Sequence, residues 1–572
     1  MCGIFGHTKP GGTIERSRAA LNTLKHRGPD QWGEWYDEKV YLGHRRLSIL
    51  DLSVRGKQPM VGGHVVISAN GEIYNFLDIK EELAKKYKFK SGSDSEVLIY
   101  GYMEWGIDGL LERIEGMYAF SLYDQKLKKL YLVRDRVGIK PLYYSMLGKQ
   151  VAWASELKAL EVFHSDELSV DYTAVYDYLT YLYIPAPKSL YKNVQKLEPA
   201  HYLEIDLTTD QSRLKRYWQL RVSAIDTSVE EAAKTVKQLV AESVEEQLIS
   251  DVPVGFFLSG GMDSSVVVAA AAQKHNKLNT YSIGFDVKEH SETHFAELVA
   301  KALKTNHMTR DLSVKEVKNS FNNLKKWYDE PFADTSAFPV YLISTLARPS
   351  STVVLTGDGG DEVFGGYNWY GKFRDQAADY VRQNSSRLSG IRSRLLGGKK
   401  GRANLELEFY SQLMGGLTSQ QKQTYRSKFN IPADYDDYWY FRNYYWQELP
   451  LMTRLQYMDF HTYLPDDILT KVDRASMAVA LECRVPLLST RLIEYLFSLP
   501  EDIKYYGGQL KGLMKYAYRS DLPIEVIERD KKGFSIPTGR WQPELMGGKV
   551  STQEFILKSL YPELVDPNGQ VD

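Results

Sequence analysis

The stretch VPVGFFLSGGMDSSVVVAAAAQK, residues 252–274, decides the fold of the larger part of this chain. An apolar run leads into a glycine loop at 259–261 and then into a run of valine and alanine. This order predicts a buried strand, a tight loop and a helix. A second strand, TYSIGFD at 280–286, and a helical stretch, ETHFAELVAKALK at 292–304, follow. Strand, helix, strand, helix indicates a parallel, doubly wound sheet.

The loop LSGGMDSS at 258–265 has the composition of an anion-binding site. Gly260 and Gly261 let backbone N–H groups approach an anion, and the N-terminus of the following helix adds partial positive charge. Hydroxyl donors come from Ser259, Ser264 and Ser265. Asp263 would repel a phosphate unless a cation lies between them, so it indicates Mg²⁺. No lysine follows the glycines as in a GxxxxGK[ST] loop, and an ordinary Gly-Ser turn is the alternative.

A second glycine-rich stretch, VVLTGDGGDEVFGGY at 353–367, also follows a β-branched strand. Loops at the carboxyl ends of neighbouring parallel strands can meet over one ligand. Asp358, Asp361 and Glu362 place three carboxylates within five residues. Such crowding is costly unless a metal ion or a cationic substrate group neutralises it, although a solvated acidic turn is the alternative.

The residues before about 200 differ from this pattern. Short β-rich segments separated by turns predict an α+β domain with antiparallel strands. The pattern ends in the polar region 200–226, and Ser228 with Glu231 then forms a capping box. One apolar face of a helix follows, made of Val229, Ala233, Val236, Val240, Val244 and Leu248. We therefore expect domains at 2–205 and 226–550, the latter mainly helical and aromatic beyond about 400, and a tail at 551–572.

Composition excludes several classes of function. The 572 residues carry a net charge of −1 without a basic stripe, which argues against nucleic-acid partners. Two cysteines cannot build a disulfide framework, and the N-terminus lacks the pattern of a signal peptide. The longest apolar run, VVVAAAA at 266–272, is far too short to cross a bilayer. We expect a soluble, cytoplasmic protein without membrane partners; the sequence does not decide the oligomeric state, and a homodimer is left open.

One of the two cysteines follows the initiator methionine in MCGIFG. A small residue at position 2 permits removal of the methionine, which would leave Cys2 with a free α-amino group. Such a residue holds a thiol nucleophile and an amine base together. Taken alone, an accident of composition at a disordered terminus explains it equally well.

Further motifs make a family resemblance specific. In the amino-terminal part these are HRGPD at 26–30, RLSILD at 46–51, NGEIYN at 70–75, GSDSE at 92–96 and RDRVGIKPLYY at 134–144. With Cys2 they resemble a class II glutamine amidotransferase domain. Joined to the two glycine loops, KVDRASMAVALECRVPLL at 471–488 and KKGFSIP at 531–537, they resemble the glutamine-hydrolysing asparagine synthetase family. The resemblance implies an N-terminal nucleophile-type αββα sandwich, then an α/β domain with a helical extension.

The resemblance assigns roles in glutamine hydrolysis. Cys2 would be the nucleophile, with its α-amino group as base. Arg46, beside Leu47, would hold the glutamine α-carboxylate. Asn70 and Gly71 would form the oxyanion hole. Glu72 and Asp94 would lie near the substrate amine. Cys483 matches no catalytic position and is expected to be a buried apolar residue.

The resemblance also assigns an ATP site. Contacts to AMP are expected from Phe257, Ile283, Thr356 and Gly357. Pyrophosphate would be held by Ser259, Gly260, Gly261, Asp263, Ser264 and Ser265, with Mg²⁺ on Asp263 and Asp361. Lys511, in LKGLMKYA, would offset charge at the adenylated carboxylate; an exposed helical lysine is the alternative.

One residue departs from the best-studied members of the family. Asp358 stands in TGDGGDE where they carry a glutamate one methylene longer. The departure leaves glutamine hydrolysis untouched but bears on the acceptor. We expect a carbon–nitrogen ligase that amidates an AMP-activated carboxylate with ammonia from glutamine. Aspartate is the first choice of acceptor, and a uronic acid of a surface polysaccharide or a secondary metabolite is the alternative.

Three rival classes fit less well. A phosphoribosyl-transferring glutamine amidotransferase would share the Cys2 start but lack SGGMDSS. A tRNA-modifying enzyme with the same phosphate loop would need a basic patch. A nonenzymatic relative would have lost its nucleophile or its carboxylates.

Overall fold

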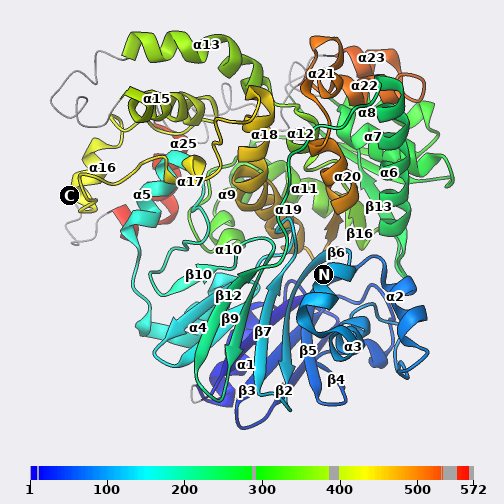
Figure 1. Cartoon of the computed structure of the whole chain (residues 1–572), viewed down its shortest axis with the longest axis vertical. Coiled ribbons are helices and arrows are strands. Elements are labelled where there is room, and N and C mark those ends of the chain that lie inside the picture. The colour runs from blue at the N-terminus through cyan, green and yellow to red at the C-terminus, as the bar shows by residue number, and fades with distance from the viewer. Residues whose placement is uncertain are drawn as a thin grey trace.

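The structure is a computed structural model that describes residues 2–9, 12–286, 292–384, 398–529, 531 and 550–565. Two halves lie one above the other (Figure 1). The lower half holds two six-stranded sheets, and the upper half surrounds one five-stranded sheet with helices. None of the described helices is long and apolar enough to span a membrane.

The lower half is a sandwich of two antiparallel sheets. The first has the order β10 (Val194–Lys196), β8 (Tyr143–Leu147), β9 (Gln150–Ala154), β1 (Gly3–Thr8), β3 (Val40–Arg46) and β2 (Gln31–Tyr36). The second has the order β12 (Gln211–Arg216), β11 (His201–Asp206), β7 (Lys129–Arg134), β6 (Gly116–Asp124), β5 (Val65–Ile73) and β4 (Met60–Gly62). Apolar residues from both sheets, including Ile4, Val66 and Trp153, fill the space between them.

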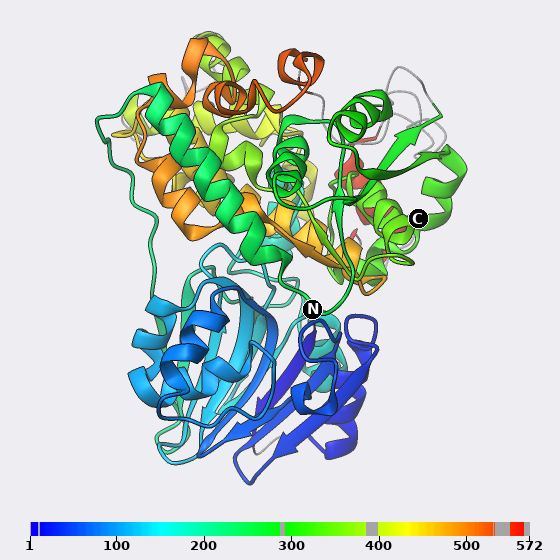
Figure 2. The same cartoon turned by 90° about the vertical axis from the view of Figure 1, so that its right-hand side faces the viewer.

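Helices cover both outer faces of this sandwich. Against the first sheet pack α1 (Ile14–Thr23) and α4 (Leu157–His164); beside the second lie α2 (Phe76–Leu83) and α3 (Glu96–Arg113). Figure 2 shows the two sheets between their helices. The predicted αββα sandwich is confirmed.

The sheet of the upper half is parallel, with the order β15 (Asn306–Leu312), β14 (Asn279–Phe285), β13 (Val254–Phe257), β16 (Val353–Leu355) and β17 (Glu482–Arg484). Three helices of this half are α6 (Val229–Leu248), α7 (Met262–Ala272) and α8 (Thr293–Ala302). The capping box of Ser228 and Glu231 is present at α6. Of its predicted apolar face only Leu248, the last residue, is not fully buried. The predicted α/β architecture is confirmed.

Beyond residue 398 the described chain is mainly helical, as expected. Its longer helices are α15 (Gly398–Leu413), α18 (Leu451–His461), α19 (Leu469–Met477), α20 (Thr490–Phe497), α22 (Gly512–Tyr518) and α25 (Thr552–Leu560). Short helices α16 (Gln423–Lys428), α17 (Trp439–Arg442), α23 (Ile524–Glu528) and α26 (Pro562–Val565) lie between or after them. Helix α25 buries Ile556 and Leu557, so this part of the expected tail packs into the core.

One helix of the first 205 residues lies in the upper half, which the sequence did not reveal. Helix α5 (Tyr172–Tyr181) lies among the helices of the upper half, where Ser411 Oγ donates to the carbonyl of Thr180 at 3.0 Å. The sheet of the lower half continues through β12, past residue 205. That strand, QSRLKR, is mostly exposed and carries no apolar alternation that would have predicted it. The domain limits themselves stay predictions.

Candidate active sites

Cys2 lies immediately before β1 with its side chain buried. Its α-nitrogen donates a hydrogen bond to Asn70 Oδ1 at 2.9 Å, and its Sγ lies 3.9 Å from the carbonyl oxygen of Leu47. Burial raises the pKa of the Cys2 thiol. A thiol with a raised pKa needs a base close by, and loss of Met1 would turn this α-nitrogen into an amine base on the same residue.

The geometry of β5 explains the Asn-Gly pair beside the cysteine. Gly71 has φ +146°, and a Cβ there would lie 2.0 Å from the carbonyl oxygen of Met117 on β6, so only glycine fits. Asn70 is fully buried, and its Nδ2 makes no hydrogen bond with a described residue. A buried donor without a partner costs free energy unless a ligand uses it. This donor suits the predicted oxyanion hole.

The guanidinium of Arg46, at the end of β3, donates hydrogen bonds to neighbouring residues. Its Nη1 donates to Gln31 Oε1 at 3.0 Å and to the carbonyl of Ser53 at 3.2 Å; its Nη2 donates to the carbonyls of Leu50 at 2.9 Å and Asp51 at 2.7 Å. Only Nε has no partner among the described residues. Contact with a glutamine carboxylate would therefore use Nε or displace one of these carbonyls.

Glu72 and Asp94 are buried acids at the end of β5. Asp94 Oδ2 accepts a hydrogen bond from the amide of Ile73 at 2.7 Å. Glu72 Oε2 lies 3.6 Å from Arg484 Nη2 of the upper half. Burial raises the pKa of both carboxyls. A substrate ammonium would lower these pKa values by compensating the acids, as the predicted role requires.

Arg27 contacts the cysteine and was given no role from the sequence. Its Nε donates to the carbonyl of Cys2 at 3.0 Å, and its two Nη atoms bind Asp473 on α19 at 2.8 and 3.0 Å. Nη1 also donates to Glu156 Oε1 at 2.7 Å, and the side chain is fully buried. The motif HRGPD marks this arginine, but its partner Asp473 is 446 residues away. Only the fold reveals that it joins the two halves.

The two glycine loops of the upper half are in backbone contact. A Cβ at Gly357 would lie 2.5 Å from the amide nitrogen of Ser264, and Gly260 has φ +73°. Ser259 and Ser264 hold the first loop through a 3.1 Å contact between their hydroxyls. Arg529, which the sequence did not single out, donates to the carbonyl of Gly260 at 3.0 Å. The loops thus form one surface, as the sequence predicted.

The predicted nucleotide residues lie on neighbouring strands. Phe257 and Ile283 are at or near the ends of β13 and β14, and Thr356 follows β16. These strands are adjacent in the sheet, so the three residues share its carboxyl edge. Ser265 differs from the other predicted phosphate donors because it is fully enclosed, and its hydroxyl has no described partner.

Lys511 connects the acids of the two loops. It forms ion pairs with Asp263 and, at 2.5 Å, with Asp361, and Lys531 pairs with Asp361 as well. At 7% exposure it is not the exposed helical lysine that the sequence left open. Despite burial, the two carboxylates raise the pKa of Lys511, and the two lysines lower that of Asp361. Residues 532–537 of KKGFSIP lie outside the described residues.

The chemistry of these donors fits Mg²⁺. Asp263 Oδ1 is buried and accepts no hydrogen bond from a described residue, which leaves one carboxylate oxygen available. The described residues hold no group of three or more metal-binding side chains. A site completed by phosphate oxygens needs only one or two carboxylates, so Asp263 and Asp361 suffice.

Asp358 follows β16 in the second glycine loop and is half-buried, whereas Cys483 lies on the neighbouring strand β17. Burial raises the pKa of Asp358, against the effect of the Lys471 ammonium, which itself pairs with Asp334 at 2.9 Å. The amide of Asp358 lies 3.5 Å from Thr356 Oγ1. Cys483 on β17 is 2% exposed, and burial raises its pKa strongly. Its expected position in the core is confirmed.

Comparison with known proteins assigns the two halves. The sequence model described as asparagine synthase matches residues 235–553, and that of a glutamine amidotransferase domain matches residues 1–218. The chain belongs to the asparagine synthase family. Membership confirms the resemblance, and the two matches follow the order of the two halves.

Relatives in the asparagine synthase family align over most of the chain. An asparagine synthetase [glutamine-hydrolyzing] 1 of Bacillus subtilis is 34% identical, covering 91% of this chain and 83% of the relative. A putative asparagine synthetase [glutamine-hydrolyzing] 2 of Methanocaldococcus jannaschii is 35% identical, covering 83% and 98%. A solved glutamine phosphoribosylpyrophosphate amidotransferase from B. subtilis shares 16% identity over 62% of this chain and 82% of that one, with a TM-score of 0.31. A likeness that weak decides nothing about this chain.

Proposed function

We propose that the chain is a glutamine-dependent asparagine synthetase. Glutamine is hydrolysed at Cys2, and ammonia passes inside the protein to the upper half. There the aspartate side-chain carboxylate attacks the α-phosphorus of ATP and pyrophosphate leaves. Ammonia then attacks the acyl carbon, giving asparagine and AMP.

The residues of the lower half support the first step. The α-amine of Cys2 takes the thiol proton, and the thiolate attacks the glutamine amide carbon. Asn70 Nδ2, which has no described partner, and the Gly71 amide are the donors for the oxyanion. Glu72 and Asp94 bind the substrate ammonium, and Arg46 binds its carboxylate.

The residues of the upper half support the second step. The loop at 259–265 binds pyrophosphate, and Phe257, Ile283, Thr356 and Gly357 bind AMP. Asp263 and Asp361 hold Mg²⁺, which when bound neutralises phosphate charge. Lys511 stabilises charge at the acyl phosphate. Asp358 orients the acceptor.

The observation that carries this proposal is that one chain holds both sites and that the fully buried Arg27 contacts the Cys2 carbonyl and Asp473. The direct test supplies the purified chain with glutamine, ATP, Mg²⁺ and aspartate. Asparagine, AMP and pyrophosphate should form in equal amounts, together with at least as much glutamate. ADP in place of AMP would contradict the proposal.

Asp358 gives a sharper test of the acceptor. Asp358→Glu lengthens a half-buried carboxylate by one methylene, and a misplacement of that size costs about a hundredfold in rate. The ratio of kcat/KM for aspartate in the two forms measures it, with glutaminase activity as the internal control. Saturating aspartate that gives no product, on enzyme that still hydrolyses glutamine, would rule out aspartate. A uronic acid would then be the acceptor to examine.

A further inference from the structure

Arg484, on β17 of the upper half, reaches the expected glutamine site of the lower half. It is 1% exposed, and its Nη2 lies 3.6 Å from Glu72 Oε2. The carbon atom of its guanidinium lies 5.9 Å from the centroid of the Tyr74 ring, which also belongs to the lower half. A cation of the upper half thus faces a carboxyl group that is expected to lie near the glutamine ammonium.

The upper half holds the rest of this guanidinium. Nε donates to Glu482 Oε1 at 2.7 Å. Nη1 donates to the carbonyls of Gln247 at 2.6 Å and Ile249 at 2.8 Å, at the end of α6. Nη2 is buried and has no hydrogen-bond partner among the described residues. Because the other two nitrogens are fixed and the guanidinium is planar, Nη2 keeps its direction toward Glu72.

The backbone of Arg484 contacts the other candidate site. Its carbonyl accepts a hydrogen bond from the amide of Thr356 at 2.9 Å, and Thr356 is one of the residues expected to contact AMP. Strand β17 itself pairs with β16, which leads into the second glycine loop. One residue therefore connects the glutamine side of the junction with the nucleotide side.

Charges of both signs surround the Glu72 carboxyl. Burial raises its pKa most, and the carboxylates of Asp94 and Glu482 raise it further, whereas Arg484 and the amino terminus lower it. Two further titratable groups nearby stay neutral at pH 7, because burial raises their pKa values: the Cys2 thiol and the Tyr74 phenol. Without Arg484 the Glu72 carboxyl would hold its proton to higher pH and would attract an ammonium less.

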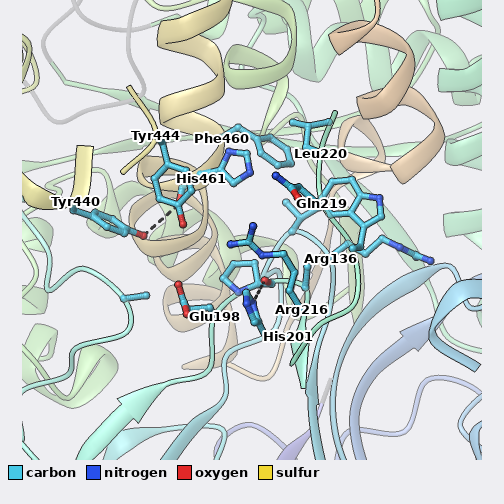
Figure 3. Close-up of a pocket in the computed structure, with 15 residues that line it drawn as sticks. Arg136, Glu198, His201, Arg216, Gln219, Leu220, Tyr440, Tyr444, Phe460 and His461 are labelled. Atoms are coloured by element: carbon cyan, nitrogen blue, oxygen red, sulfur yellow. Dashed lines mark hydrogen bonds between the residues drawn. The ribbon is translucent and has the colours of Figure 1, made fainter. Parts of the chain in front are cut away.

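Arg136 is a second buried arginine at the junction, and it is held differently. It lines a cavity between the two halves (Figure 3). It donates to the carbonyls of Ile114 at 2.7 Å and Leu111 at 2.9 Å, and it lies 3.3 Å from Glu115. These partners all belong to the lower half. Arg136 therefore supports its own half, whereas the Arg484 side chain crosses the junction.

We propose that Arg484 is a positioning residue of the glutamine site, supplied by the upper half to keep the Glu72 carboxylate ionised and directed at the substrate ammonium. This inference rests on the proposed function, in which Glu72 binds that ammonium. In this role Arg484 acts on glutamine through Glu72. The glutamine site is then complete only when β17 of the upper half is docked against the lower half.

Equilibrium dialysis of radiolabelled L-glutamine tests this role over about pH 5 to 8, where a carboxyl with a raised pKa loses its proton. The full chain carries Cys2→Ala to prevent hydrolysis, and ATP is omitted. In Arg484→Met the affinity should fall about tenfold at pH 5, because a nearby charge shifts a carboxyl pKa by about one unit or more. The deficit should shrink as pH rises and the Glu72 carboxyl loses its proton in both forms.

Three further variants separate the charge of Arg484 from its packing. Arg484→Lys keeps a positive charge and should retain more affinity at pH 5 than Arg484→Met. Arg484→Gln keeps hydrogen-bond donors without the charge and should lose affinity as Arg484→Met does, which gives a second measurement if the methionine variant does not fold. Arg136→Met is the matched control, since it removes a buried arginine of the same junction and should leave the affinity unchanged. Thermal midpoints verify that the variants fold.

Steady-state kinetics of glutamine hydrolysis, with Cys2 intact, give an independent measurement. Arg484→Met should raise KM for glutamine and change kcat by less than about threefold, because Glu72 binds the ammonium and not the reacting amide. Unchanged affinity, a loss of affinity that is equal at every pH, or a fall in kcat with unchanged KM would each overturn the inference. A wild-type chain that does not hydrolyse glutamine would instead contradict the proposed function itself.

Discussion

The two candidate sites are built in different ways. Around Cys2, three strands of the sandwich bring together backbone groups and a neutral amide, and the central contact is a 2.9 Å hydrogen bond to Asn70. At the glycine loops, side chains from distant segments meet as charges, with Lys511 between Asp263 and Asp361. At the first site the Asn70 amide is already hydrogen-bonded to the Cys2 nitrogen, whereas the second site holds opposite charges that a ligand must rearrange.

This difference follows from what each site has to bind. An oxyanion forms only during the reaction, and fixed dipoles stabilise it without reorganisation. In the proposed function ATP arrives already charged and with a cation, so carboxylates that would then face Mg²⁺ need a substitute counter-charge beforehand. Lys511 supplies that counter-charge in this structure. Substitutions in the two sites should therefore separate their activities and their responses to Mg²⁺.

Cys2→Ala should have the largest effect. Loss of the nucleophile should reduce glutamine hydrolysis by at least about a thousandfold, while synthesis from added ammonia continues. Glutamate release and amide formation measure the two activities. Cys483→Ala is the matched control, because that thiol is buried on β17 and should leave glutaminase unchanged. Glutaminase activity that persists in Cys2→Ala would show that Cys2 is not the nucleophile.

Asp263→Asn should break the other site alone. Removing one of the two carboxylates proposed to hold Mg²⁺ should lower AMP formation about a hundredfold to a thousandfold with either nitrogen donor. Glutaminase should persist because Cys2 lies in the other half. Asp375→Asn, on the exposed surface of α13 (Asn368–Asn384), is the control. Equal loss of both activities would point to misfolding instead of a separate site.

Lys511→Met should lower stability through the repulsion between the Asp263 and Asp361 carboxylates. Removing the ammonium leaves Asp263 and Asp361 with Lys531 as their remaining described counter-charge, and breaking a buried ion pair costs up to about 3–5 kcal/mol of stability. Added Mg²⁺ should then raise the thermal midpoint of the variant more than that of the wild type, because it replaces the lost charge. Lys515→Met, one turn further along α22, controls for loss of a lysine. No difference in the Mg²⁺ response would refute this account.

The same contrast explains what the sequence could predict. Cys2 lies in one short motif and the pair Asn70–Gly71 in another, and the residues within each motif stay close together in the fold. The paired glycine loops follow strands that alternate with helices, a pattern that the sequence shows. Arg27 and Asp473 could not be paired in advance, because nothing local relates residues 446 positions apart. The sequence likewise could not predict that α5 lies in the upper half, or that the Arg46 guanidinium hydrogen-bonds to neighbouring carbonyls. Tertiary contacts of buried charges decide these features.

Glu362→Gln should have the smallest effect on either activity, and its effect on stability should appear as a pH dependence. Glu362 follows Asp361 in the second loop and accepts a hydrogen bond from the Tyr367 hydroxyl at 2.7 Å. Burial raises its pKa to about 8, whereas an unfolded glutamate titrates at about 4.3. Between these values the folded state holds a proton that the unfolded state lacks. The contribution of the protonated Glu362 carboxyl to stability is therefore complete at low pH and is lost as pH rises through 8.

Glutamine does not titrate, so the variant lacks this loss. The free energy of unfolding of Glu362→Gln relative to the wild type should rise by up to about 1.4 kcal/mol per pH unit from pH 5 to 8 and then level off. Urea unfolding at a series of pH values measures it. Glu525→Gln, exposed on α23, should run parallel to the wild type. A pH-independent difference in Glu362→Gln would mean that the carboxyl is ionised in the folded protein.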